Sequence, residues 1–386
     1  MAQRLRLELV ADHATVDLIS ELPLELKVRI LECLPTRDAA RTALLSTHWN
    51  HVWLRLGRLA FDNDFFWGIQ KCSGESIVPS KIITCVLLQR VWPVKKFSLN
   101  IAALIDPMLK QSDLDQWCLY LSRNGIEELD ISLWNPQYKL PFCIVSCPTI
   151  KQLRLNSLGF DCPINAPSIF RGVTSLIFLD VVFNRNVNGI VSSIPNLEKL
   201  EFIGCEGISN FKFTAPKLES LSIIGFIPAA ESRWLSLHLE TIKVLCLDHS
   251  CMLLMGVLKL LQISPNLREL DIKIIGSQDD DIEVILRLLK DPDSCIVNQD
   301  LKMLKTIKIN RFRGSTTEML FVKMLLSKSP KLESVVIQEY YFVHRQYNKV
   351  IKSQRELCFP RASPKAQIIV LGNSMGSVCM QLRNVR

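Results

Sequence analysis

One short apolar pattern recurs along most of the chain, and it constrains the fold more than any other feature. Each copy holds an apolar residue, two variable residues, a second apolar residue, one variable residue and a third apolar residue, as in LEKLEF at 197–202. From Leu129 onward the copies lie 21 to 28 residues apart, with one longer step of 37. Such a series predicts stacked repeats rather than one closed core. The middle apolar residues are Phe97, Leu129, Leu153, Leu176, Leu200, Leu221, Leu245, Leu270, Ile307 and Val335.

Each repeat is expected to supply one short strand and one return segment. A period of roughly 20–29 residues is typical of leucine-rich repeats, whose strands stack in parallel. Side chains alternate along a strand, so the recurring apolar residues point into a shared interior and the residues between them point outward. Prolines just before several strands, such as Pro265 and Pro330, end the preceding return segments. The sequence therefore predicts an α/β solenoid, with helical returns over 113–124, 251–261 and 281–289.

The first sixty residues carry helical rather than strand periodicity. We predict a helix over 22–34 that starts at Pro23 and stops at Pro35, and a second helix capped by Thr36 that runs to Leu45. A third helix, capped by Ser46 or Thr47, places four apolar residues on one face. Their apolar faces either form the core of a small domain or dock a partner, and tryptophan is enriched at interface anchors. The four residues are Trp49, Val52, Trp53 and Leu56.

Composition and charge exclude several classes of protein. Hydrophobic residues make up 48% of the chain, too many for a disordered protein. The net charge of +8 is concentrated at one end, because residues 340–386 hold eight Lys or Arg against Glu356 alone. The body is then nearly neutral and offers no basic face for nucleic acid. We expect no membrane span and no secretory signal, and hence thirteen reduced cysteines in a protein of the cytoplasm, the nucleus or both.

The basic C-terminal segment admits three interpretations: a solvated terminus, a patch for nucleic acid or an acidic partner, and a folded cap. Its aromatic residues gather mostly at its start instead of alternating with basic ones, as a stacking platform for bases would require. A solenoid needs its last apolar edge covered, and KAQIIVLG at 365–372 has the pattern of a last strand. We therefore favour a folded cap with a charged outer surface.

Enzyme motifs do not rise above background. His48 and His51 lie three residues apart on the predicted third helix, but no Cys or carboxylate completes a metal site at ligand spacing, so surface residues are the better interpretation. Cys143 and Cys147 do not have zinc-ribbon spacing and fit buried thiols. The acidic run 279–281 fits a solvated helix start. There is no phosphate-binding glycine loop and no GxSxG motif.

The N-terminal helices resemble the F-box at its usual spacing, and the whole chain is similar to plant F-box/FBD/LRR-repeat proteins. The motif residues of the F-box are Asp17 to Ser20, Leu22, Pro23, Leu26, Ile30, Leu31, Leu34 to Thr42, Leu45, Ser46, Trp49 and Trp53. The C-terminal part is similar to the FBD signature through Leu304 to Ile309, Phe312, Gly314, Glu318, Met319, Phe321 to Lys323, Leu332, Glu333 and Phe359 to Pro364.

This resemblance implies an F-box over 14–60, a leucine-rich-repeat solenoid over 61–300 and an FBD region over 301–375 that caps it, with flexible ends at 1–13 and 376–386. It also implies the substrate-recognition subunit of a Skp–cullin–F-box ubiquitin ligase, which binds cullin only through the adaptor. Such a subunit needs no catalytic residue, cofactor, nucleic acid, membrane or homo-oligomer. The adaptor-binding residues would be Leu22, Pro23, Leu26, Ile30, Leu31, Leu34, Pro35, Leu45, Trp49 and Trp53.

Two other classes of function stay open from the residues: a binding scaffold or adaptor decoy outside a productive ligase, and an enzyme on a repeat frame. The outward strand positions are expected to bind the target through an apolar strip bordered by acids, unless loops or the FBD region cover it. A target with apolar anchors and flanking Lys or Arg would fit, whereas a polyanion cofactor would not. The expected target-binding residues are Asp130, Ile177, Leu179, Ile203, Ile224, Val244, Asp248, Glu269 and Asp271.

Overall fold

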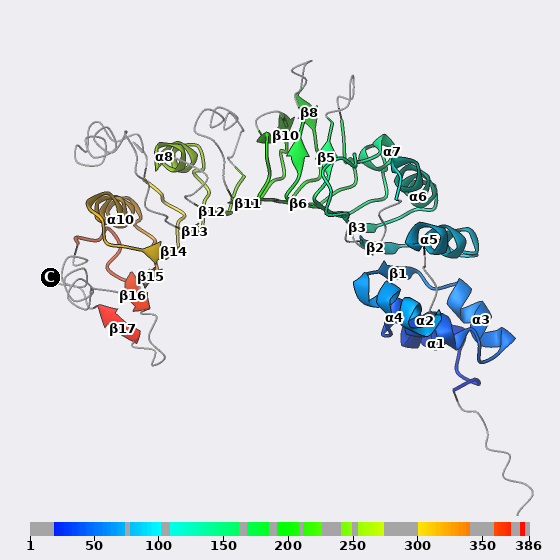
Figure 1. The fold of residues 1–386 in the computed structure, drawn as a ribbon. Coiled ribbons are helices and arrows are strands. Elements are labelled where there is room, and N and C mark those ends of the chain that lie inside the picture. Colours follow the sequence, from blue (N-terminus) through cyan, green and yellow to red (C-terminus); the bar gives the residue numbers. More distant parts are fainter. Residues whose placement is uncertain are drawn as a thin grey trace, which may run out of the picture. The chain divides into compact units, whose positions relative to one another are not determined.

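A computed structural model of the chain consists of two compact units, Met1–Asp130 and Ile131–Arg386 (Figure 1). The structure describes residues 19–73, 78–101, 109–161, 168–184, 191–208, 211–225, 241–248, 254–273, 300–339, 359–371 and 379–382. The predicted helix over 281–289, the acidic run 279–281 and residues 340–358 of the basic segment 340–386 lie outside these residues.

The N-terminal unit begins with three short helices and continues into the first parallel strands. Strands β1 and β2 pair in parallel, with Arg58 opposite Lys96 and Phe61 opposite Leu99. The boundary between the two units falls within β3 (Glu128–Ser132). The elements before it are α1 (Leu24–Glu32), α2 (Thr36–Thr42), α3 (Thr47–Leu54), β1 (Arg58–Phe61), α4 (Asn63–Ser73), α5 (Pro79–Leu88), β2 (Lys96–Asn100) and α6 (Gln111–Arg123).

The three predicted N-terminal helices are present, and one capping prediction is wrong. The Ser46 hydroxyl accepts a hydrogen bond from the Trp49 N–H at 3.2 Å and so caps α3 as expected. Thr36 lies inside α2 instead of capping it, because Pro35 occupies the cap position. The Thr36 hydroxyl accepts from the Ala60 N–H in β1 at 2.8 Å. This bond ties the second helix to the first strand.

The core of the N-terminal unit joins the helices to the strands. α1 and α3 bury one face each, and β1 and β2 add their inward side chains. Arg90, itself buried, lies 4.1 Å over the Trp53 ring and donates to the Trp53 carbonyl at 2.7 Å. Burial lowers the pKa of Arg90 to about 10. The core residues include Leu31, Trp49, Val52, Trp53, Leu56, Leu59, Phe61, Phe97 and Leu99.

The C-terminal unit is the repeat array. Its main sheet runs in the order β4, β6, β9, β11, β12, β13, β14, β15, β16 and β17, parallel up to β16, with β17 antiparallel to β16. Two small parallel pairs, β5 with β7 and β8 with β10, lie on the return segments. Helices α8 and α10 cover the same side of the main sheet (Figure 1).

These elements have the following bounds: α7 (Phe142–Val145), β4 (Gln152–Asn156), β5 (Gly159–Phe160), β6 (Ser175–Leu179), β7 (Val182–Phe183), β8 (Ser192–Ser193), β9 (Lys199–Ile203), β10 (Phe213–Thr214), β11 (Ser220–Ile224), β12 (Val244–Asp248), α8 (Leu254–Gln262), β13 (Glu269–Lys273), β14 (Thr306–Phe312), α10 (Thr316–Lys328), β15 (Ser334–Glu339), β16 (Gln367–Leu371) and β17 (Cys379–Leu382).

The repeat register predicted from the sequence is confirmed. Every middle apolar residue of the series lies in a strand and is buried, from Phe97 to Val335. The predicted helix over 113–124 corresponds to α6. One prediction is wrong at the N-terminal end, because the first strand is β1 rather than the Phe97 strand. At the other end, β17 lies within 376–386 and follows the predicted last strand β16. The expected flexibility of 376–386 stays a prediction. Both β1 and β17 add to an array whose apolar edges need covering.

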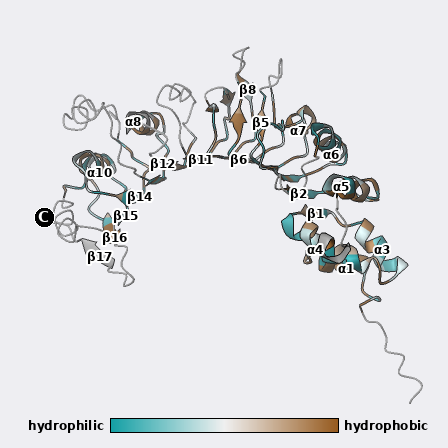
Figure 2. Cartoon of the chain, viewed as in Figure 1, coloured by the Kyte–Doolittle hydropathy of each residue, from teal (hydrophilic) through white to brown (hydrophobic). Residues whose placement is uncertain are grey.

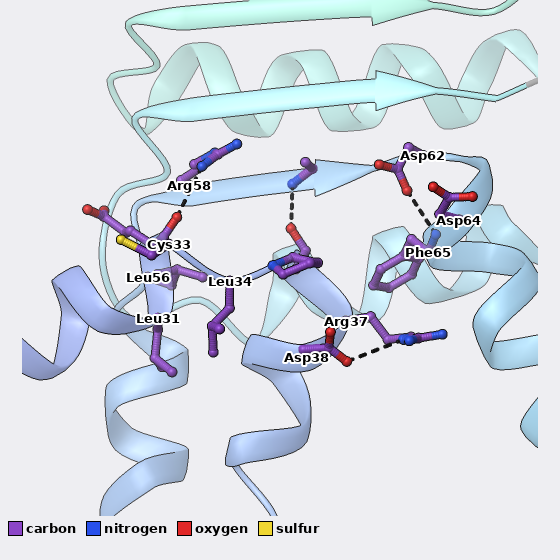
Figure 3. A pocket seen from close by; sticks show the side chains of 14 residues that line it. Leu31, Cys33, Leu34, Arg37, Asp38, Leu56, Arg58, Asp62, Asp64 and Phe65 are labelled. Atoms are coloured by element: carbon purple, nitrogen blue, oxygen red, sulfur yellow. Dashed lines mark hydrogen bonds and ion pairs between the residues drawn. The ribbon is translucent and has the colours of Figure 1, made fainter. Parts of the chain in front are cut away.

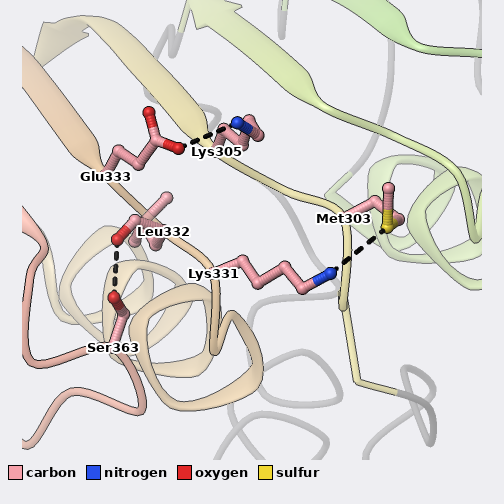
Figure 4. A network of polar contacts seen from close by, with 6 residues as sticks. All are labelled: Met303, Lys305, Lys331, Leu332, Glu333 and Ser363. Carbon is pink, nitrogen blue, oxygen red and sulfur yellow. Dashed lines mark hydrogen bonds and ion pairs between the residues drawn. The ribbon is translucent and has the colours of Figure 1, made fainter.

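A repeated backbone contact holds neighbouring repeats together just before most strands of the array. One carbonyl accepts two consecutive N–H groups of the next repeat. The Lys305 carbonyl, for example, accepts from Glu333 at 2.8 Å and from Ser334 at 3.1 Å. Side chains reinforce this contact in the FBD region, where Lys305 pairs with Glu333 at 2.9 Å and the Ser363 hydroxyl donates to the Leu332 carbonyl at 2.6 Å (Figure 4). The stacking is therefore fixed by the main chain first.

The residue after each of several neighbouring strands has a left-handed backbone conformation. Ser157, Asp180, Gly204 and Gly225 follow β4, β6, β9 and β11 in turn, and all have positive φ. The N–H of Asp180 donates to the Ile203 carbonyl, and that of Gly204 to the Ile224 carbonyl, each at 2.7 Å. This row ends the strands at one level across four repeats.

Gly225→Ala should destabilise the repeat array. Gly225 has φ +122, and an added Cβ would lie 2.7 Å from the Gly204 nitrogen and 2.8 Å from its Cα, so the backbone must shift. We expect the free energy of unfolding to fall by about 1–3 kcal/mol, measured by urea denaturation followed by circular dichroism. Gly57→Ala is the control, because its added Cβ meets no atom closer than 3.7 Å. Equal effects of both substitutions would show that the close approach of Gly225 to Gly204 does not constrain the array.

Thr36→Val should loosen the junction between α2 and β1. The substitution keeps the shape of the buried side chain but leaves the Ala60 N–H without its acceptor, a loss of about 1–3 kcal/mol. Amide hydrogen exchange at Ala60 should accelerate in this variant. Thr36→Ser retains the hydroxyl and should retain the slow exchange. An Ala60 amide that exchanges equally slowly in both variants would show that the bond does not hold the strand.

Candidate interaction surfaces

Helix α1 and the turn after it present an exposed apolar stripe beside the buried residues Lys27 and Leu31. Leu26, Ile30 and Leu34 are spaced by four residues, so they lie on one face of a helical path, and they are 44%, 41% and 38% exposed. Helices of this region carry both hydrophobic and hydrophilic residues (Figure 2). Leu45, in the turn before α3, is also exposed, at 71%. A small helical unit that leaves such a stripe in water has the features of a docking surface.

The structure divides the residues expected at the adaptor into two groups. Pro23, Leu26, Ile30, Leu34, Pro35 and Leu45 are exposed, and Leu22 is half-buried. Leu31, Trp49 and Trp53 are buried at 1%, 7% and 6% exposure. These three pack the interior of the free chain, and the expected part of the tryptophans in adaptor binding stays a prediction. They shape the stripe without lying in it.

A buried lysine fixes the turn in front of α1. Lys27 is 2% exposed, and its ammonium group donates to the Ser20 carbonyl. The same group lies 2.6 Å from His48 Nε2. The pattern of apolar spacing missed Lys27 as an interior residue, because the helix face alone gives no reason to bury a cation. A cation beside His48 disfavours a metal ion there. Among the described residues, no group of three or more His, Cys, Asp or Glu is arranged to hold one.

A pocket of about 420 Å³ lies where the turn between α1 and α2 meets β1 (Figure 3). Leu31, Leu34, Leu56 and Phe65 supply its apolar lining. Several of its polar side chains bond to nearby backbone groups or to one another. Arg58 donates to the Glu32 carbonyl at 3.0 Å, the Asp62 carboxylate accepts from the Phe65 N–H at 2.8 Å, and Arg37 forms an ion pair with Asp38 at 3.6 Å.

A second exposed apolar group follows α5 and was missed by the sequence reasoning. Leu88, Val91 and Trp92 are 74%, 67% and 53% exposed, and the Arg55 guanidinium lies 5.3 Å over the Trp92 ring. In the sequence, the run LLQRVWP at 87–93 indicates this group, because it places three apolar residues within five positions, more than the short helix α5 buries.

The outward residues of the repeat strands form an outer strand face in three rows, as the parallel register shows. The middle row mixes charged, polar and apolar residues along the sheet. Lys199 and Glu201 form an ion pair at 2.8 Å on β9. Burial raises the pKa of Asp271, against the opposing effects of Lys308 and a hydrogen bond from Asn310. The middle row is Arg154, Ile177, Glu201, Ser222, Cys246, Asp271, Lys308, Val336 and Ile369.

The structure brings together most of the residues expected at the target. Ile177, Leu179, Ile203 and Ile224 lie on the outer strand face of neighbouring strands and are partly exposed. Val244, Glu269 and Asp271 lie on the same face of β12 and β13. Asp248 ends β12, but its side chain lies outside the described residues. Asp130 belongs to the N-terminal unit, so the acidic border that includes it is not assembled within one unit.

No helix among the residues that the structure describes is long and apolar enough to cross a membrane.

Cys205, which follows β9, is buried, and this burial raises the pKa of its thiol to about 11. Its sulfur therefore stays protonated and packs as an apolar group.

Comparisons with known proteins match both units. Residues 19–60 match the family model of the F-box domain, and residues 89–228 match the model described as "At1g61320/AtMIF1, LRR domain". The chain is 28% identical to the Arabidopsis thaliana F-box/FBD/LRR-repeat protein At1g13570 over 433 residues, which cover 92% of this chain and 98% of that protein.

Two further relatives from Arabidopsis thaliana match over half of this chain. The putative F-box protein At3g58860 is 30% identical over 203 residues, which are 43% of its length. The putative F-box/LRR-repeat protein At3g49150 is 28% identical over 199 residues, which are 31% of its length. The chain therefore spans nearly all of At1g13570 and less than half the length of the other two.

Proposed function

We propose that this chain, which belongs to the plant F-box/FBD/LRR-repeat protein family, is the substrate-recognition subunit of a Skp–cullin–F-box ubiquitin ligase. The observation that carries the proposal is the exposed apolar stripe of Leu26, Ile30 and Leu34 on the first helix of the F-box. An F-box implies binding of a Skp1-type adaptor, and this stripe is the surface on which the adaptor would dock.

The adaptor would contact α1 and the turn before α3. Leu26, Ile30 and Leu34 supply aliphatic anchors, and Pro23 and Leu45 extend the surface at either end. Leu31, Trp49 and Trp53 support it from the interior. Docking removes an apolar surface from water at roughly 25 cal/mol per Å², which favours association. Because the adaptor joins this surface to the cullin, cullin binding is indirect.

The repeats would hold the target, while a separate ubiquitin-conjugating enzyme performs the chemistry. In this proposal the chain is a non-catalytic subunit of the ligase, and it acts in the cytoplasm or the nucleus without a cofactor. The bond from the Ala60 N–H to Thr36 supports such a role, because it couples the F-box helices to the first repeat strand. The first repeat strand is thus tied to the second helix of the F-box.

The double substitution Leu26→Ala and Ile30→Ala should weaken adaptor binding without unfolding the F-box. Both side chains are more than two-fifths exposed, so their truncation removes contact area and leaves the core intact. We expect the affinity for a purified Skp1-type adaptor to fall about thirtyfold or more, measured by isothermal titration calorimetry. The melting temperature of the free chain should not change.

Leu88→Ala is the matched control, because Leu88 is an exposed leucine outside the α1 stripe. It should bind the adaptor as the unsubstituted chain does. If the double variant binds equally well, the stripe is not the adaptor surface. If the unsubstituted chain binds adaptor but forms no complex with the adaptor–cullin assembly, the chain is a scaffold or decoy and not a ligase subunit.

A further inference from the structure

Three aliphatic side chains lie side by side at the ends of neighbouring repeat strands. The parallel register places Leu179 of β6 opposite Ile203 of β9, and Ile203 opposite Ile224 of β11. All three are partly exposed on the outer strand face, and Ile177 lies beside them in the middle row. We call Leu179, Ile203 and Ile224 the aliphatic row. Elsewhere the last outward strand position is polar at Asn156, Lys273 and Asn310, and it is aliphatic again at Leu371 in β16.

Bare backbone and one acid border the aliphatic row at the ends of the strands. Gly204 and Gly225 follow Ile203 and Ile224 directly, and their closely packed backbones lie next to the row. An added Cβ on Gly204 would lie 2.1 Å from Asp180 Oδ1, so the Asp180 carboxylate lies over this glycine. Asp180 is exposed, and among the described residues no side chain forms an ion pair with it.

The spacing of the row selects the shape of a partner. Neighbouring strands lie about 4.8 Å apart, so the three side chains span about 9.6 Å. A helix rises about 1.5 Å per residue, so positions i, i+3 and i+7 span about 10.5 Å on one face. An extended segment repeats its side chains on one face only every 6.7 Å or so, and three of them span about 13 Å. The helix matches the row and the extended segment does not.

We infer that the aliphatic row binds an amphipathic helix of the target protein, laid across β6, β9 and β11. Three aliphatic residues of that helix, one turn apart, pack on Leu179, Ile203 and Ile224. The backbone of Gly204 and Gly225 flanks the helix on one side. A Lys or Arg on that flank faces the Asp180 carboxylate, which sets the direction of the helix. The inference rests on the proposed function only in taking this partner to be the target.

The test presents the purified full-length chain to two displayed libraries. One displays a stable helical hairpin randomised on a single exposed face, and the other displays unstructured peptides of equal length. The helical library should be enriched in three aliphatic residues at i, i+3 and i+7 with a Lys or Arg on one flank. Affinities of the selected hairpins are then measured by surface plasmon resonance against variants of the chain.

Ile203→Asp should weaken the selected hairpins about thirtyfold, as expected for the centre of a contact. Val336→Asp is the matched control, a partly exposed aliphatic residue on the same face in β15, and it should bind as the unsubstituted chain does. Asp180→Asn should weaken hairpins that carry the flanking Lys or Arg, and leave unchanged those in which it is replaced by Gln.

Several outcomes would overturn the inference. Preferential enrichment of the unstructured peptides would assign the row to an extended segment. Equal binding to Ile203→Asp would place the contact elsewhere. Binding that appears only after residues 226–240 are replaced by a Gly/Ser linker would show that the chain covers its own row. Adaptor binding is measured on the same preparations, so a failure of the proposed function appears there and not in the hairpin selection.

Discussion

Everything in the C-terminal unit depends on parallel strands that stack in one register. A single repeat buries only one side of its inward Leu or Ile pair, so it needs a neighbour on each side. The main chain enforces that neighbour, because one carbonyl before most strands accepts two N–H groups of the next repeat. Residues such as Leu200, Leu221 and Leu245 are then covered on both sides and fully buried. The array must also be closed at its ends, which β17 does by pairing with β16.

Because the inward residues and the main chain hold the repeats together, the residues of the outer strand face are not constrained by stacking. The inward positions must be apolar, whereas the outward positions do not affect the stacking and can vary between neighbouring strands. In β6, β9 and β11 the last outward residue is aliphatic, and in β13 and β14 it is Lys273 and Asn310. A face that changes chemistry over a few strands, on a frame that does not change, is suited to recognise a particular protein surface.

In the F-box, a single helix likewise combines a buried face with exposed apolar residues. α1 buries Leu31 and Lys27 on one face and leaves Leu26 and Ile30 in water on the adjacent face. The inner side is needed for the three-helix bundle to fold, and the outer side is available for the adaptor. The tryptophans of α3 belong to the inner side, so truncating Trp49 or Trp53 would disturb folding before it tested binding.

The sequence by itself determined the repeat register, the three N-terminal helices and the outward residues of each strand, because apolar periodicity reports directly on burial. It did not determine β1 or β17, whose short patterns are weak and whose strands exist because array edges need partners. Tertiary structure also decided which F-box residues are exposed, since Trp49 and Leu26 are both apolar and only packing separates them. The role of Thr36 was decided in the same way: its hydroxyl suits a helix cap, but the nearby Ala60 N–H is the donor that the fold brings to it.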